Sequence, residues 1–344
     1  MNTFKFIGTI PKPSDKSQMI KTMSNGNKQF KILIRQNETN SAFVQMYSDT
    51  LFNGSIPVFF TSNNGRQLVN FEDRLDKDIL NKISFASKYI INNGDTELEF
   101  IWKDDFIEYA YEMITTMPSN TIYEIRGEYV ITYYNDKPYN NFNIKSIKIA
   151  NNSRPEFTMY LELFYNHNSF DERDKRNKFV LNTFIEQYVH SSKQREYFPL
   201  QVQFITNRFD FTKPTDIEII KHRKSNMFPK EEEGYVKALW EAQYIRGAQL
   251  ILPPLETLPK DIQFEIINAG RDIKDYMGKI VGEAKEYICL TRPDNTLNKE
   301  GKVYISLNCT KNEFESKINQ HYKEQYENTL DNIAQEDAKN NPFN

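Results

Sequence analysis

The chain has 344 residues, of which 39% are apolar and 14% aromatic, and its formal net charge is −3. This length allows two domains, and the apolar content suffices for buried cores. With 12 Gly and 14 Pro, the chain is neither a linker nor a low-complexity protein.

Charge and cysteine content narrow the class further. Residues 311–344 hold four of the 44 Lys and Arg and seven of the 47 Asp and Glu. Residues 1–310 therefore hold 40 basic and 40 acidic residues. A neutral body of this kind neither announces nor excludes a nucleic-acid binder, because the charge of a local groove matters more than the total. Two cysteines, Cys289 and Cys309, give no disulfide framework. With no visible signal peptide and no apolar run of about 18 residues, we expect a cytoplasmic protein without a membrane segment.

The first 62 residues predict strands joined by loops. Strand-like stretches occupy residues 4–10, 29–35, 41–48 and 56–62. In 29–35, Phe30, Ile32 and Ile34 alternate with Lys31 and Arg35, which is the period of a strand with one buried face.

The period then changes. Residues 75–90 and 103–117 fit helices, and two further strands follow in 122–150, around an "NDKP" turn. Several strands, then helical material, then a closing hairpin is the order expected of a five-stranded OB-like barrel. We therefore predict a first OB-like domain over residues 1–152, with a helical insertion at about 75–118.

After Arg154 and Pro155 the pattern restarts. Three strands are predicted at 156–166, 179–190 and 197–206, and a closing hairpin from 286–292 and 301–308. Between them, helical segments are predicted at 234–251 and 259–282, together about 234–282. The second OB-like domain is therefore placed at 153–310, and residues 311–344 form an acidic, mobile tail. The fold class predicted is mainly β with helical insertions (α+β), as tandem OB-like barrels.

Motifs that carry catalysis or hold cofactors are not found in the sequence. There is no phosphate-binding loop, no dinucleotide fingerprint and no nucleophile elbow. The histidines at 167, 190, 222 and 321 are scattered, which argues against a zinc site. Paired carboxylates at Asp171 and Asp174 could serve a two-metal nuclease, but their basic neighbours favour a solvated loop. We expect no enzyme, no catalytic residue, no metal and no cofactor.

Aromatic and cationic residues on the strands are the candidate functional set. An unpaired nucleic-acid strand offers phosphate charge and the faces of its bases, and a barrel surface with exposed rings flanked by Lys and Arg meets both. In the first domain the predicted nucleic-acid-binding residues are Lys31, Arg35, Phe43, Tyr47, Arg126, Tyr133, Tyr134, Lys137, Tyr139 and Phe142. In the second they are Arg173, Lys175, Arg176, Lys178, Lys193 and Arg195. The competing interpretation is that strand rings are core and that charged loops are merely solvated.

The C-terminus adds a separate hint. It ends "QEDAKNNPFN", with acidic residues before Pro342 and Phe343. This resembles the tail of bacterial and phage single-stranded DNA-binding proteins, in which an acidic segment ending in Pro-Phe recruits replication partners. Here Asn344 follows Phe343 and Lys339 dilutes the acidity, which departs from that pattern.

Together, the barrel order, the aromatic strands and the tail resemble an OB-fold single-stranded DNA-binding protein of a phage replication system. The resemblance implies sequence-tolerant binding of single strands in replication or recombination, in the host cytoplasm, with replication proteins as partners of the tail. It leaves self-association open. Two other functions stay open: a virion structural or assembly protein, and a metal-dependent nuclease.

Overall fold

The computed structural model describes residues 2–318, with gaps at 25, 38–39, 49–57, 63–64, 135–136, 172–177, 190–191, 206–212, 216–217, 219–226, 251–272, 275–279, 294–301 and 308. Strands dominate this described part, so the predicted mainly β class is confirmed. No helix in it has the length and apolar character needed to cross a bilayer.

Five strands of the N-terminal half close into a ring. They are β1 (Thr3–Thr9), β3 (Lys28–Arg35), β4 (Ser41–Tyr47), β9 (Ile122–Tyr134) and β10 (Lys137–Ile149). β1 pairs with β3 and β9, β3 with β4, and β9 with β10, all antiparallel. A parallel contact between β4 and β10, at Asn143 and Gln45, closes the ring. Numbered by their order in the sequence, β1, β3, β4, β9 and β10 are strands one to five of this ring. Around the ring they follow one another in the order one, two, three, five, four.

Local alternation explains why β3 and β4 face the way they do. Phe30, Ile32 and Ile34 are fully buried, whereas the intervening Lys31 and Arg35 are exposed, as predicted. In β4, Ala42, Val44 and Met46 point inward and the residues between them point outward.

A second ring with the same order follows. Its strands are β11 (Glu156–Tyr165), β13 (Lys178–Val189), β14 (Gln194–Ile205), β15 (Val236–Leu250) and β17 (Ile280–Pro293). β11 pairs with β13 at Phe164 and Phe184, and with β15 along most of its length. β14 and β17 are the parallel pair, which corresponds to β4 and β10 of the first ring.

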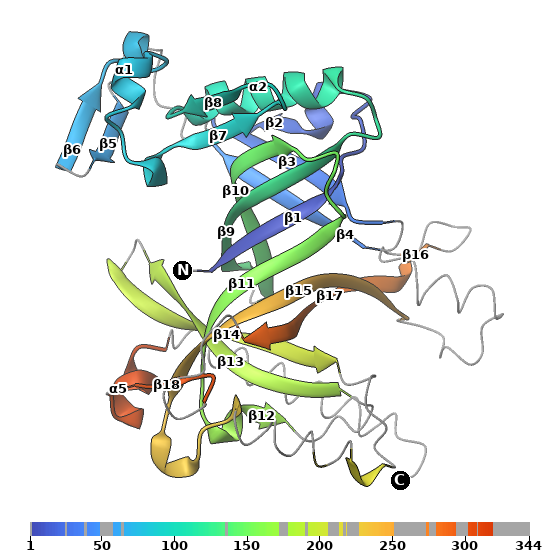
Figure 1. The fold of residues 1–344 in the computed structure, drawn as a ribbon, viewed down its shortest axis with the longest axis vertical. Coiled ribbons are helices and arrows are strands. Elements are labelled where there is room, and N and C mark those ends of the chain that lie inside the picture. Colours follow the sequence, from blue (N-terminus) through green and yellow to red (C-terminus); the bar gives the residue numbers. More distant parts are fainter. Residues whose placement is uncertain are drawn as a thin grey trace.

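The two rings are joined through their first strands. Residues Thr3–Ile7 of β1 pair antiparallel with Glu156–Tyr160 of β11, so one sheet runs through both rings (Figure 1). Gly8 lies where β1 passes from β11 to β3, and a Cβ there would come within 2.1 Å of the Arg35 carbonyl oxygen. The first strand therefore needs a glycine at this close approach.

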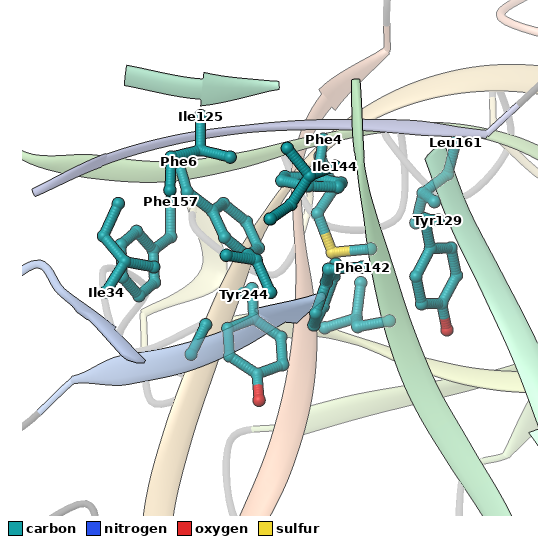
Figure 2. Packing of buried hydrophobic residues seen from close by; sticks show 14 of the residues in the cluster. Phe4, Phe6, Ile34, Ile125, Tyr129, Phe142, Ile144, Phe157, Leu161 and Tyr244 are labelled. Carbon is teal, nitrogen blue, oxygen red and sulfur yellow. The ribbon is translucent and has the colours of Figure 1, made fainter. Parts of the chain in front are cut away.

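Aromatic packing continues across the junction. The ring of Phe6 stacks on Phe157 at 4.5 Å between centroids, and Phe142 meets Tyr244 edge-on at 5.0 Å (Figure 2). Phe6 and Phe142 belong to the first ring, and Phe157 and Tyr244 to the second. One hydrophobic core therefore serves both rings.

The segment between β4 and β9 is an insertion with mixed structure. It contains β5 (Val58–Ser62), β6 (Gly65–Val69), α1 (Lys77–Leu80), β7 (Tyr89–Asn92), β8 (Glu97–Phe100) and α2 (Lys103–Thr116). The helix predicted at 103–117 is confirmed as α2, which buries Phe106, Ile107 and Ala110. The helix predicted at 75–90 is wrong beyond residue 80. Tyr89 starts a strand there, because β7 pairs in parallel with β10.

The helix predicted over 234–251 is also wrong, because this segment forms β15. Val236, Ala238, Trp240, Ala242 and Tyr244 are buried at every second position. That is a strand period, concealed by residues with high helix propensity. Of the helix predicted at 259–282, residues 273–274 and 280–282 are strand and the rest lies outside the description.

Short elements complete the fold. They are β2 (Ile20–Thr22), β12 (Phe170–Asp171), β16 (Ile273–Lys274), β18 (Ile305–Ser306), α5 (Lys311–Ser316), and 3₁₀ turns at Lys16–Gln18, Phe71–Asp73, Phe85–Ser87, His167–Ser169 and Glu231–Glu233. The predicted hairpin of 286–292 with 301–308 is wrong, because β18 pairs with β15. The tail also differs from the prediction of mobility from residue 311, since α5 buries Phe314. Residues 319–344 are outside the description.

Candidate nucleic-acid interface

The outward side of β2, β3, β4, β9 and β10 forms a continuous polar and aromatic surface, called here the stacking face. Strand register brings its members together: Lys21 opposes Gln29, Gln29 opposes Tyr47, and Lys31 opposes Gln45. Tyr139 opposes Thr132 on the β9–β10 hairpin. The members of the stacking face are Lys21, Gln29, Lys31, Arg35, Phe43, Gln45, Tyr47, Thr132, Tyr139 and Asn141.

Three aromatic side chains of this face are exposed to solvent. Phe43 is 45% exposed, Tyr47 41% and Tyr139 47%. Phe43 and Tyr47 are four residues apart on one side of β4, which corresponds to roughly 13 Å along the strand. Each of these aromatic side chains therefore presents a flat apolar surface at a separate point of the same sheet.

Amide side chains between the rings hydrogen-bond to one another. Gln29 Nε2 donates to the Tyr47 hydroxyl at 2.8 Å, and the hydroxyl donates to Gln45 Oε1 at 3.3 Å. Gln45 Nε2 donates to Asn141 Oδ1 at 2.6 Å, which links β4 to β10. Asn141 Nδ2 in turn donates to Thr132 Oγ1 at 2.5 Å. This network fixes the ring of Tyr47 and uses the amides within the protein.

Cations of the stacking face are exposed and available. The ammonium of Lys31 lies 4.3 Å from the centroid of Phe43, and Lys21 and Arg35 are exposed nearby. Among the described residues, no carboxylate comes within 4.0 Å of these three side chains. An exposed cation–π contact contributes only about 0.5–1 kcal/mol, so the Lys31 ammonium can still meet a phosphate.

A second region of the outer surface, called here the charge-paired side, has a different charge arrangement. On β1, β9, β10, β11, β15 and β17 each of five cations lies against a carboxylate: Lys5–Glu156, Arg126–Glu124, Lys145–Glu128, Lys237–Glu162 and Arg292–Glu241. The hydrogen bond from Lys5 to Glu156 raises the pKa of that lysine. Positive charge on this side is balanced locally, whereas on the stacking face it is not.

The binding residues predicted in the first ring differ in where the structure places them. Lys31, Arg35, Phe43, Tyr47 and Tyr139 lie together on the stacking face. Phe142 was placed wrongly, because it is 1% exposed and packs inside the core. Its neighbour Asn141 points outward instead, and Phe142 and Ile144 take the inward positions of β10.

The remaining first-ring predictions have other outcomes. Arg126 is exposed, but it lies on the charge-paired side and binds Glu124 at 2.7 Å. Tyr133, Tyr134 and Lys137 end the β9–β10 hairpin, where Tyr134 pairs with Lys137, and their side chains lie outside the description.

Few predicted residues of the second ring are described. Arg173, Lys175, Arg176 and the rival nuclease residue Asp174 fall in the gap at 172–177, and the side chains of Asp171 and Lys178 are not described. Lys193 takes a positive φ of 55° in the turn between β13 and β14. Arg195 donates to Glu186 at 2.7 Å, and this hydrogen bond raises the arginine pKa. Pro342 and Phe343 lie outside the described residues.

Five members of the stacking face were missed from the sequence: Lys21, Gln29, Gln45, Thr132 and Asn141. Alternation alone would have placed Gln29 and Gln45 outward, beside Lys31 and Phe43. The other three needed the strand register. In the described part of the chain, no group of three or more His, Cys, Asp or Glu side chains could hold a metal ion.

Comparison with known proteins adds two structural neighbours. Neither a protein-family model nor a curated protein matches the sequence. The chain is similar to the wild-type single-stranded DNA binding protein from Thermus aquaticus, with 7% identity and a TM-score of 0.34, over 87% of this chain and 94% of that one. For a deletion mutant of the same protein the values are 8%, 0.35, 87% and 96%. Similarity at this level assigns neither a family nor an activity to this chain.

Proposed function

We propose that this chain binds single-stranded DNA through the stacking face, with little dependence on sequence and without catalytic turnover. The observation that carries the proposal is the grouping of three exposed rings with three cations that lack carboxylate partners among the described residues. Bases would stack on Phe43, Tyr47 and Tyr139, and phosphates would pair with Lys31 and its neighbours.

The arrangement of strands supports the same location. Each ring has the strand order one, two, three, five, four, with three and five parallel, and we interpret both rings as OB-like barrels. Barrels of this kind bind oligonucleotides across strands two and three and the loop between four and five. In the first ring of strands these are β3, β4 and the β9–β10 hairpin. The exposed aromatic side chains lie on β4 and on the hairpin, and the cations Lys31 and Arg35 lie on β3.

The amide network supports low sequence dependence. Base identity is read by hydrogen bonds to base edges, which need free donors and acceptors. Both N–H groups of Asn141 are used within the protein, by Thr132 Oγ1 and the Tyr139 carbonyl. Stacking, in contrast, serves every base, and each stack contributes roughly 1–3 kcal/mol.

The biological setting that we propose is the replication or recombination of phage DNA. The sequence of the tail supports this setting, because Pro342 and Phe343 follow acidic residues there. Replication proteins would be the partners of this tail.

Titration of fluorescent oligo-dT at two salt concentrations tests the function. We expect binding that weakens steeply with salt, because cations of the face displace the counterions of the strand. Tyr139→Ala should weaken binding with an unchanged melting temperature, and the matched variant Tyr139→Phe, which keeps the ring, should bind like the wild type. Absence of binding with large self-assemblies would favour a structural protein, and strand cleavage dependent on divalent metal would favour a nuclease.

A further inference from the structure

In the second ring, a phenylalanine from the end of the described chain lies between two parallel tyrosine rings. The centroid of Phe314 is 4.1 Å from that of Tyr197 and 3.9 Å from that of Tyr235, with interplanar angles of 18° and 13°. Aromatic pairs in protein cores more often sit offset or edge-on, at centroid distances of about 4.5–7 Å. The two tyrosines therefore form a slot with the thickness of one flat ring.

This slot lies on the side of the second ring that matches the stacking face. Tyr197 belongs to β14 and Phe184 to β13, the third and second strands of their ring. Both point outward, since their neighbours Ile185 and Phe198 are buried in the main core. In the first ring, the third strand carries the exposed Phe43 and Tyr47.

The segment that covers the slot is short, and its contacts with the second ring include a hydrogen bond between Glu315 and Tyr235. α5 has six residues and begins at the Thr310 cap. Beyond it, the Tyr197 N–H donates to the Lys317 carbonyl at 3.0 Å, and Ile318 is 97% buried beside β14. None of the strand pairings that close the second ring involves residues 310–318. Loss of the contacts of this segment would therefore leave the strand pairings of the ring in place.

We propose that the gap between Tyr197 and Tyr235 is a second stacking site for an unpaired nucleobase, which Phe314 fills when no strand is bound. This inference rests on the proposed function of the stacking face. A base and a phenyl ring present the same flat apolar surface to a tyrosine, so one replaces the other without rearranging the slot.

Because a base must displace the Phe314 side chain, binding at the second site depends on binding at the first. Displacement of Phe314 exposes its ring and the aliphatic side chain of Ile318 to water, which opposes binding of a free nucleotide. A strand already held on the stacking face reaches the slot at a high effective concentration, which favours the exchange. Short oligonucleotides should therefore leave α5 in place, and long ones should release it.

Hydrogen exchange of the wild-type full chain tests this directly. With saturating long oligo-dT we expect faster amide exchange at Phe314, Lys317 and Ile318, whose N–H groups are bonded within residues 310–318 in the free protein. Strands β3 and β4 should exchange more slowly in the same sample. Unchanged or slower exchange in residues 310–318, with oligo-dT bound, would overturn the second site alone. If no oligo-dT binds, the proposed function itself fails.

Variants give an independent reading. Phe314→Ala should raise the affinity for long oligo-dT by about fivefold or more, the lower end of what one stack contributes. Phe314→Ala combined with Tyr197→Leu should return the affinity to that of the wild type. Asn312→Ala, an exposed position of the same helix, is the control and should change nothing. A folded Phe314→Ala protein with wild-type affinity would contradict the proposal.

Discussion

The side-chain amide of Gln187, on β13, hydrogen-bonds both backbone groups of Ile131, on β9 of the other ring. The Ile131 N–H donates to Gln187 Oε1 at 2.6 Å, and Gln187 Nε2 donates to the Ile131 carbonyl at 3.1 Å. Asn40 makes the reciprocal contact with β15, where its amide donates to the Tyr244 carbonyl and accepts from the Arg246 N–H, each at 3.0 Å. Each ring thus holds the fourth strand of the other through side-chain hydrogen bonds.

Loss of the Gln187 contact should destabilise the whole fold. Gln187→Ala leaves two backbone groups of the buried Ile131 without partners, which should lower the free energy of unfolding by about 1–3 kcal/mol. Denaturant titration measures the change. Gln201→Ala is the matched control, since its exposed amide bonds only to the Asn182 side chain among its described contacts, and it should stay within about 0.5 kcal/mol of the wild type. Equal effects of the two variants would argue against the clamp.

Phe43→Ala should weaken oligo-dT binding by about 5–150-fold, which is the loss of one base stack. Its melting temperature should hardly move, because the ring is 45% exposed and lies outside the core. Phe85→Ala is the control of the same type, as Phe85 is 73% exposed but belongs to the insertion and not to the stacking face. Similar losses of affinity for both would show that exposed rings matter without regard to position.

Lys31 and Arg126 should differ in their contribution to salt dependence. Lys31→Ala removes a cation with no carboxylate neighbour among the described residues, so the slope of log affinity against log salt should fall by roughly 0.7. Arg126→Ala should leave that slope unchanged, because Arg126 is already paired with Glu124. Titrations at several salt concentrations give both slopes. A lower slope for Arg126→Ala would place phosphates on the charge-paired side.

Alkaline pH should loosen the contact of α5 with the second ring. Burial raises the pKa of Tyr197 and of Tyr235 to about 12, from an ordinary value of 10.0. Because the folded state holds these protons more tightly than the unfolded state, the stabilisation is complete below about pH 10 and is lost as pH rises towards about 12. Tyr235→Phe removes one titrating group and should lose less stability than the wild type between about pH 9 and about pH 11 in denaturant titrations.

Features of the fold that depend on residues close together in the sequence could be predicted, and features that depend on distant residues could not. Strands β3 and β4, and the outward direction of Lys31 and Phe43, follow from an alternation that neighbouring residues set. The same alternation was present in β15 but was hidden by Ala, Leu, Glu and Gln, whose helix propensity is high although the sheet overrides it. Phe142 differs from the prediction for a related reason: its alternation with Ile144 predicts burial, although the hairpin around it is rich in aromatic residues, some of which are exposed.

The sequence by itself determined that the chain is mainly β, that a helix precedes the β9–β10 hairpin, and that β3 and β4 carry rings and cations on their outer side. The tertiary structure alone decided which strands pair in each ring, that Arg126 is paired with a carboxylate while Lys31 is not among the described residues, and that Phe314 enters a slot between Tyr197 and Tyr235. The reason is physical: alternation is written into adjacent residues, whereas register, ion pairing and ring stacking depend on segments brought together from distant parts of the chain.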